Sequence, residues 1–218
     1  MDTKIDEKDT KSDTNISGFY YIENYLTKEE NTKLLNLLQE SDEWEHIGGS
    51  DKARRVIQYG YTYSYDRTGV TKLDENIPKI FSKLVKPNRV NNAIGTDLIK
   101  SEFEQLIINE YIAGQGIAAH TDHIKYFGSI IICISLGSDI DINFTRISDK
   151  KSITVRVKKR SLYVMSGDAR YKWMHEIIKR KKDGGDKRSL RYSLTYRTIM
   201  DSYKEKDKKW SKIISILF

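Results

Sequence analysis

His120 and Asp122 belong to a His-Thr-Asp triplet that follows a strand-like segment and the turn Ala-Gly-Gln-Gly. In an extended chain, residues i and i+2 point to the same side, so this imidazole and this carboxylate can bind one metal ion. The third ligand must then come from a distant strand, where His175 is available. Two histidines and a carboxylate on one face of an octahedron leave three open positions, which suits non-heme iron(II). The alternative is that these histidines are structural, because one such triplet among four histidines arises readily by chance.

A second group of polar residues lies on strands around this triplet. Arg191 and Arg197 are six residues apart in RYSLTYR, so a strand places both on one face. Burying an arginine is costly unless an anion pairs with it, and a dicarboxylate such as 2-oxoglutarate would supply that anion. Upstream, Asn109 and Tyr111 alternate on the strand that leads to His120 and offer an amide and a phenol to the same pocket.

These elements in this order resemble the signature of the AlkB-type iron(II)- and 2-oxoglutarate-dependent dioxygenases. The signature is Asn-Glu-Tyr, His-Thr-Asp, a distant histidine and Arg-Tyr-Ser-Leu-Thr-Tyr-Arg. The phrases NEYIAGQGIAAHTD, ISLGSDIDINF and SLYVMSGDARYKWMHEI are especially similar to the AlkB domain of the tRNA wobble-uridine hydroxylases. The resemblance covers roughly residues 17–200.

The resemblance implies an enzyme that uses Fe(II), 2-oxoglutarate and O2 to hydroxylate a C–H bond, or to remove an N-methyl group as formaldehyde. It implies iron ligands at His120, Asp122 and His175. It also implies 2-oxoglutarate contacts from Asn109, Tyr111, Arg191 and Arg197, and substrate contacts from Tyr59, Tyr61, Tyr63 and, on the wall of the active site, Arg170.

Two positions depart from the DNA-repair members of that family. Ile124 stands two residues after Asp122, where those members carry an acidic residue that helps read the alkylated base. Isoleucine can accept neither a proton nor a hydrogen bond. Ser193 replaces an asparagine that is common in the arginine motif. Both differences argue against simple repair of 1-methyladenine or 3-methylcytosine.

The elements that must position these residues follow from the hydrophobic pattern. Thr27 and Glu30 form a capping box that opens a helix with a leucine-rich face, and a second helix is expected over 74–84, ended by Pro87 and followed by an irregular, asparagine-rich stretch. Downstream, the chain consists of short apolar strands separated by turns, with helices only upstream. The pattern predicts a mainly β protein with supporting helices (α+β), of the double-stranded β-helix or jelly-roll type. The predicted strands are EQLIINEYI, SIIICISLG, IDINFTRI, SITVRV, SLYVMS and RYSLTYRTI.

Tyrosines recur at every second position from Tyr59 to Tyr65 in YGYTYSY. One continuous strand would display all four on one face. Such a row either packs across strands or forms an aromatic surface that stacks a planar base.

Composition limits the domain organisation and the partners. We expect a disordered leader over 1–16, one catalytic domain over 17–200 and a basic, then apolar tail over 201–218. The formal charge of +7 favours a nucleic-acid partner, although solubility alone can explain it. A single cysteine excludes an intrachain disulfide, and no stretch resembles a secretory signal or a membrane span. The chain is therefore expected to be soluble and intracellular; a monomer is plausible, and the sequence leaves the oligomeric state open.

Three functions compete at this stage. The first is oxidation of a modified or alkylated base in DNA or RNA. The second is hydroxylation or demethylation of a protein side chain by the same chemistry. The third is a jelly-roll binding module without turnover, which the complete set of predicted ligands argues against.

Overall fold

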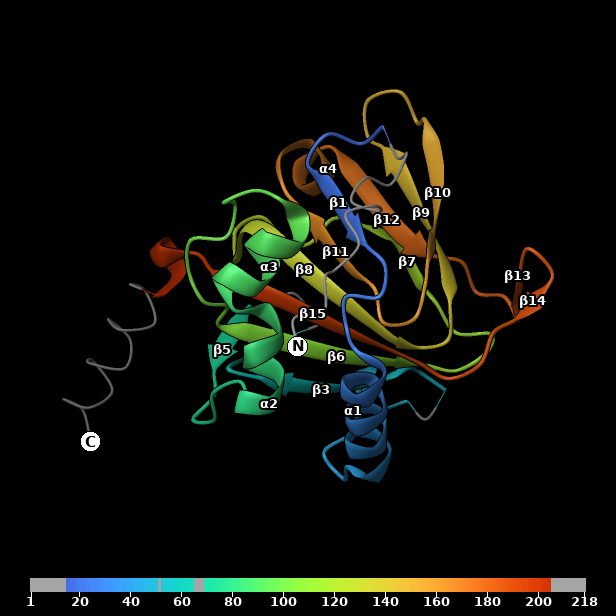
Figure 1. The fold of residues 1–218 in the computed structure, drawn as a ribbon, viewed down its shortest axis with the longest axis horizontal. Helices are drawn as coiled ribbons and strands as arrows, with labels where there is room; N and C mark the ends of the chain where they lie inside the picture. Colours follow the sequence, from blue (N-terminus) through green and yellow to red (C-terminus); the bar gives the residue numbers. More distant parts are fainter. Residues whose placement is uncertain (1–14, 51, 65–68, 205–218) are drawn as a thin grey trace, which may run out of the picture.

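The computed structural model describes residues 15–50, 52–64 and 69–204, and within them most strands form two antiparallel sheets (Figure 1). The larger sheet runs in the order β1 (Phe19–Ile22), β11 (Leu162–Met165), β8 (Phe127–Gly137), β15 (Arg191–Ile199), β6 (Gln105–Tyr111), β3 (Arg55–Tyr59) and β2 (Glu45–His46). The smaller sheet runs in the order β10 (Ser152–Val157), β9 (Ile140–Arg146), β12 (Trp173–Ile177) and β7 (Ile117–His120). Two hairpins complete the set: β4 (Tyr61–Tyr63) with β5 (Val70–Lys72), and β13 (Lys182–Asp183) with β14 (Asp186–Lys187).

Helices cover one face of the larger sheet (Figure 1). They are α1 (Lys28–Glu40), α2 (Lys79–Ser82) and α3 (Pro87–Ile94), with the 3-10 turns η1 (Ile47–Gly49) and η2 (Lys83–Val85). The predicted capping box opens α1, because Thr27 Oγ1 accepts from the Glu30 amide at 3.1 Å and the Glu30 carboxylate accepts from the Thr27 amide at 3.2 Å. The described residues contain no helix that is long and apolar enough to cross a membrane.

Strand β6 shows how the two layers arise, because all seven of its residues are buried. Leu106 and Ile108 belong to the core beneath the helices, whereas Ile107, Asn109 and Tyr111 line a cavity on the opposite face. Strand β15 divides in the same way along its length. The alternation of side chains along a strand thus places one set of residues in a helix-covered core and the other set between the sheets.

The six predicted strands are confirmed, and the fold is the expected jelly roll. The helix expected over 74–84 begins later than expected: α2 starts only at Lys79, after Pro78, and continues as η2 to Val85. This helical stretch ends before Pro87, as expected, but Pro87 also begins α3, where a proline without an N–H group is tolerated in the first turn. Helix α3 therefore occupies the stretch that was expected to be irregular. The expectation of helices only upstream is also wrong, because a short helix, α4 (Gly167–Tyr171), lies between β11 and β12.

The expected continuous tyrosine strand is broken at Gly60, which has φ 76°. A Cβ atom there would lie 1.9 Å from the carbonyl oxygen of Glu104, so the chain turns at a position that only glycine fits. Tyr59 ends β3 and Tyr61 begins β4, so the tyrosines do not share one face. Tyr65, most of the predicted leader and most of the predicted tail lie outside the described residues.

The hairpin of β13 and β14 is attached to the smaller sheet through Asp183. This carboxylate is 1% exposed and accepts from Arg188 Nε at 2.7 Å, from Arg180 Nε at 2.6 Å and from the Asp141 amide at 3.1 Å. Burial raises the pKa of Asp183, but the two arginines outweigh that effect and lower it to about 2. The carboxylate is therefore charged at neutral pH and holds both arginines in place.

Replacing Asp183 with asparagine should lower the free energy of unfolding by about 3 kcal/mol at neutral pH, since it leaves the buried Arg188 without its anion. Because the folded pKa lies below the usual 3.8, the ionised Asp183 stabilises the fold above pH 4. That stabilisation should disappear as the pH falls from about 4 to about 2. Urea unfolding of both proteins at pH 7 and pH 3 checks this. A difference between the two proteins that stays constant across this range would contradict it.

Candidate active site

A cavity of about 580 Å³ lies between the two sheets, and its walls carry the polar faces of β6, β7, β12 and β15. The two groups of residues singled out in the sequence meet there, although they come from four separate parts of the chain. The lining includes His120, Asp122, His175, Asn109, Tyr111, Arg191 and Arg197.

Two neighbouring strands bring the histidines together. His120 at the end of β7 is the direct register partner of His175 in β12, and their ring centroids lie 4.3 Å apart. Asp122 follows β7 immediately, and its Oδ2 lies 3.9 Å from His175 Nε2. The pairing of β7 with β12 therefore brings His175 close to His120 and Asp122, as a third ligand from a distant strand must be.

Local hydrogen bonds and charges prepare these three side chains to bind a cation. His120 Nδ1 lies 2.8 Å from the Ala118 carbonyl oxygen, which can only accept, so Nδ1 carries a proton and Nε2 is the ring nitrogen that can bind a metal. Burial lowers the pKa of His175 to about 3, which keeps that imidazole neutral. Burial raises the pKa of Asp122, but the charge of Arg197 and the nearby histidines outweigh it and lower it well below the usual range.

Two imidazoles and one ionised carboxylate are the donors that non-heme iron(II) takes. In this structure no three His, Cys, Asp or Glu side chains of the described residues are drawn tightly enough around one point to hold an ion. Asp122 is instead turned towards Arg197. The residues thus fit an iron site by chemical type, charge state and position on adjacent strands.

Arg197 binds the Asp122 carboxylate rather than projecting alone into the cavity. Its Nε donates to Asp122 Oδ1 at 2.8 Å, and its Nη1 donates to Gln105 Oε1 at 3.1 Å. Gln105 is fully buried, and its Nε2 donates to the Tyr61 carbonyl at 3.1 Å. This chain links the segment of β4 to the predicted metal ligand. Gln105 was not singled out in the sequence, because a glutamine at a strand end carries no chemical signature.

Arg191 has the only buried side-chain nitrogen without a hydrogen-bond partner in the part of the chain that the structure describes. Its Nε donates to Ser135 Oγ at 2.9 Å, whereas Nη1 has no partner. The guanidinium is 1% exposed and lies 5.5 Å from the ring centroid of Tyr111. A buried arginine with an unpaired nitrogen on a cavity wall fits the carboxylate of 2-oxoglutarate by charge and geometry.

A third arginine reaches the same wall and was missed in the sequence. Arg54 Nε donates to Asn109 Oδ1 at 3.0 Å, and its guanidinium lies 5.8 Å from the ring centroid of Tyr111. Arg54 directly precedes β3, at the end of the basic, glycine-containing loop IGGSDKARR. The available signal was a pair of arginines directly before a strand that pairs with β6.

The four predicted substrate residues lie in different parts of the structure. Tyr63 lines the cavity, with its ring centroid 5.6 Å from that of Phe127. Tyr61 is buried in the core between the sheets, and Tyr59 packs in the other core, 5.8 Å from the ring of Phe81. The prediction that the tyrosines share one substrate-binding face is therefore wrong for Tyr59 and Tyr61, because the turn at Gly60 redirects the chain.

The predicted place of Arg170 on the active-site wall is also wrong. Arg170 is 2% exposed, is not among the lining residues, and donates from Nη1 to the Asp122 carbonyl at 2.8 Å and from Nε to the Gly128 carbonyl at 3.2 Å. It holds the backbone of the loop that carries Asp122. Sequence alone does not reveal this role, because a side chain that binds backbone carbonyls leaves no pattern of partner residues.

Comparisons with known proteins agree with this geometry. The model of the 2OG-Fe(II) oxygenase superfamily matches residues 18–197. Uncharacterized protein L905 of Acanthamoeba polyphaga mimivirus is 35% identical over 194 residues, 85% of this chain and 87% of that protein. The tRNA (carboxymethyluridine(34)-5-O)-methyltransferase alkbh8 of Xenopus tropicalis is 30% identical, and the match covers 91% of this chain but 34% of that protein. The solved structure of OsALKBH1 shares the fold, with a TM-score of 0.66 and 16% identity, over 83% of this chain and 96% of that one.

The fold, the cavity and these matches together define the class of protein. The chain belongs to the 2OG-Fe(II) oxygenase superfamily, as an AlkB-like dioxygenase that uses Fe(II), 2-oxoglutarate and O2. It spans about a third of the length of the alkbh8 protein that it matches.

Replacing Arg191 with methionine should raise the Kd for 2-oxoglutarate about 100-fold, since a charge-assisted hydrogen bond contributes about 1.5–3 kcal/mol. Arg191→Lys keeps the charge but loses the planar fork, so its affinity should lie between the two. Isothermal titration of the Mn(II)-loaded protein measures both constants. An unchanged Kd for the methionine variant would exclude Arg191 from the cosubstrate site.

Proposed function

We propose that this chain oxidises a modified or alkylated base in nucleic acid, by hydroxylation or by oxidative demethylation. The observation that carries the proposal is one cavity that combines His120, Asp122 and His175, the unpaired nitrogen of Arg191 and the ring of Tyr63. A volume of about 580 Å³ is in the range of small-molecule sites and leaves room for a planar ring beside a small dicarboxylate.

The aromatic side chains on the solvent side of the cavity support a planar substrate. Tyr63 and His123 both line the cavity and are half-buried. Tyr126 joins them, because it stacks on His123 at 4.3 Å between ring centroids and meets Tyr63 at 6.5 Å. Bases of every kind offer a flat π face, so such rings favour a base without requiring a particular sequence.

Bound Fe(II), 2-oxoglutarate and O2 would supply the oxidation: one oxygen atom of O2 enters a substrate C–H bond, and 2-oxoglutarate becomes succinate and CO2. The chain's own residues supply position and charge. Arg197 donates to the side-chain carboxylate of Asp122, and Arg170 donates to its backbone carbonyl. Arg191 offers a cationic hydrogen-bond donor to the cosubstrate. The wall formed by β6 and β15 is buried, so bulk water is kept from that side of the cavity.

The relatives and the charge support nucleic acid over other substrates. The Xenopus tropicalis relative is named for tRNA, and the formal charge of +7 favours a polyanion. The methyltransferase activity in that name is not part of the proposal, because this chain matches only 34% of that protein.

The decisive experiment incubates the full chain with Fe(II), 2-oxoglutarate, O2 and a panel of methylated or wobble-modified RNA and DNA oligonucleotides, read by mass spectrometry. We expect a gain of one oxygen or the loss of a methyl group on at least one of them. His120→Ala is the control and should release no succinate. No mass change on any oligonucleotide, with oxidation of a peptide from a parallel array, would replace this proposal with a protein substrate. Equal succinate release by the wild type and His120→Ala would indicate a binding module without turnover.

Replacing Tyr63 with alanine should raise KM for the oligonucleotide by roughly 5- to 150-fold, because base–aromatic stacking contributes about 1–3 kcal/mol. Tyr63→Phe keeps the ring and should stay within about threefold of the wild type. The Kd for 2-oxoglutarate should not change in either variant. Steady-state kinetics with one modified oligonucleotide tests this, and an alanine variant with wild-type KM would remove Tyr63 from the base site.

A further inference from the structure

The segment from Lys179 to Arg188, KRKKDGGDKR, has six basic side chains and two carboxylates, and includes the hairpin of β13 and β14. Its basic side chains fall into two groups. Both arginines bind Asp183, as described above. All four lysines are exposed and form no ion pair within the described residues; they are Lys179, Lys181, Lys182 and Lys187.

This hairpin is fixed beside the cavity. Arg188 Nη1 donates to the Ile178 carbonyl at 2.7 Å, and the Gly114 amide donates to the Arg180 carbonyl at 3.2 Å. Lys179, at the base of the hairpin, lines the cavity itself. The exposed positive charges therefore stand in a fixed relation to the candidate active site.

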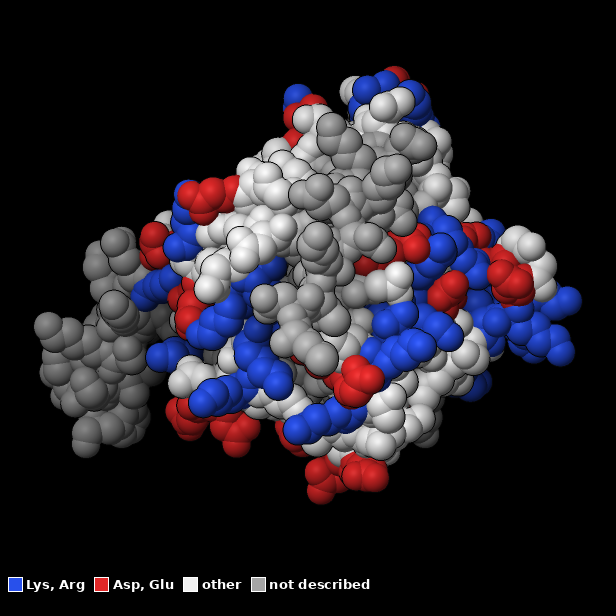
Figure 2. Space-filling model, viewed as in Figure 1, with Lys and Arg blue, Asp and Glu red and all other residues white. Residues whose placement is uncertain are grey.

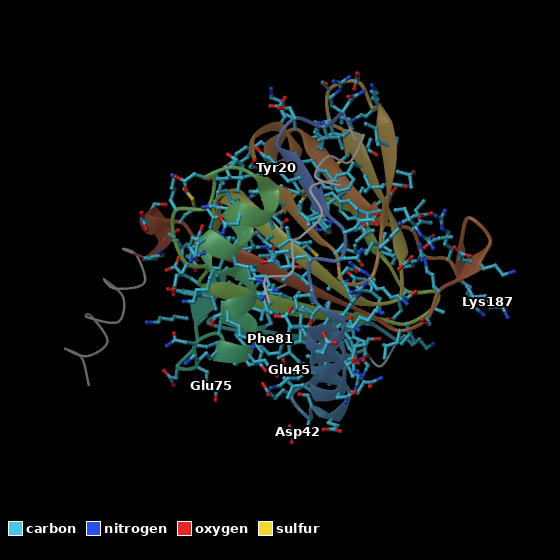
Figure 3. The ribbon with its side chains drawn as sticks, viewed as in Figure 1. Tyr20, Asp42, Glu45, Glu75, Phe81 and Lys187 are labelled. Carbon is cyan, nitrogen blue, oxygen red and sulfur yellow. The ribbon has the colours of Figure 1, made fainter. Side chains whose placement is uncertain are left out.

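Basic side chains gather over the hairpin, at the right of Figure 2, and further basic side chains lie across the middle of the visible surface. Acidic side chains lie along the lower edge. Lys187 projects outward from the hairpin, whereas Asp42 and Glu75 lie at the lower edge (Figure 3). A polyanion that approaches the molecule is thus attracted to the hairpin and repelled at the lower edge.

We propose that the sugar-phosphate backbone flanking the target base lies along the hairpin and is bound by Lys181, Lys182 and Lys187. This inference rests on the proposed function, because it takes the substrate to be nucleic acid. From Lys179 to the turn at Gly184, an extended chain spans at most about 16 Å. Lysines along this length can contact neighbouring phosphates, whereas the base itself would lie inside the cavity. Lysine acts as a point charge, so the contact adds affinity without reading sequence.

The test is a triple variant, Lys181→Gln, Lys182→Gln and Lys187→Gln, in the full chain. The matched control replaces three equally exposed lysines on the helices: Lys28, Lys33 and Lys79. Binding of a fluorescent single-stranded oligonucleotide is measured by anisotropy from low to high salt. Each lost phosphate contact lowers the slope of log K against log salt by about 0.7, so the hairpin variant should lose about 2 from this slope and the control none.

Two further readouts separate the hairpin from the chemistry. Succinate release without nucleic acid should be the same in the wild type and both variants, since the hairpin lysines do not include any predicted metal or cosubstrate ligand. Urea unfolding should also be unchanged, because the substituted side chains are exposed. A hairpin variant that keeps the wild-type salt slope, or a control that loses as much, would overturn the inference.

The proposed function and the inference can fail separately. Oxidation of an oligonucleotide with no effect of the hairpin variant overturns the inference alone. Lysine-dependent binding of oligonucleotides without oxidation of any of them supports the hairpin surface and contradicts the proposed function. Binding to vesicles of anionic lipid in place of oligonucleotides would overturn the inference by assigning the surface to a membrane.

Discussion

The buried ion pair between Asp122 and Arg197 is the interaction on which the candidate site depends. Two charges removed from water are stable only where their remaining hydrogen-bonding groups are also satisfied. Here Gln105 accepts from Arg197, and Arg170 donates to the Asp122 carbonyl, so the carboxylate is held from both sides. An ionised carboxylate next to two histidines is then available at neutral pH, and the loop after β7 cannot move without breaking this network. The same network reaches the β4 segment through Gln105, which donates to the Tyr61 carbonyl, so β4 and the loop that carries Asp122 share one support.

Strands β6 and β15, which build one wall of the cavity, are buried on both faces, and this constraint explains why polar residues occur at alternate positions in these otherwise apolar strands. In β15, Tyr192 and Leu194 pack under the helices while Arg191 and Arg197 face the cavity. A shift of register by one residue would place the arginines in the apolar core and the apolar residues in the cavity. Register is therefore set by the core, and the site inherits its geometry from the packing of the larger sheet. The single cysteine fits this arrangement as a packing residue: Cys133 is buried beside Ser193, with Sγ 2.9 Å from Oγ.

The parts predicted correctly from the sequence are those that depend on the two-residue period of a strand. The strand assignments, and the convergence of Arg191 and His120 on one cavity, follow from that period and from the order of the motifs. The failures occur where a local backbone feature overrides the period. A left-handed glycine at position 60 separates Tyr59 from Tyr63, and Pro87 begins a helix in a stretch that was expected to be irregular. The contacts of Gln105, Arg54 and Arg170 could not be predicted from the sequence, because their partners are an arginine, an amide and backbone carbonyls, respectively, that only the folded chain brings near.

Selectivity for the substrate must come from different contacts than those that bind the iron and the cosubstrate. Ile124 is 59% exposed two residues beyond Asp122, and it offers no acceptor for a donor group on a base. The half-buried rings of Tyr63 and His123 offer stacking area, which tolerates many bases. For the proposed base substrate, we expect discrimination at this cavity to rest on shape and on the reach of a C–H bond to the iron site, more than on a hydrogen bond from position 124. An exposed lysine hairpin fits such a site well, because contacts to phosphates add the affinity that weakly selective base contacts do not supply.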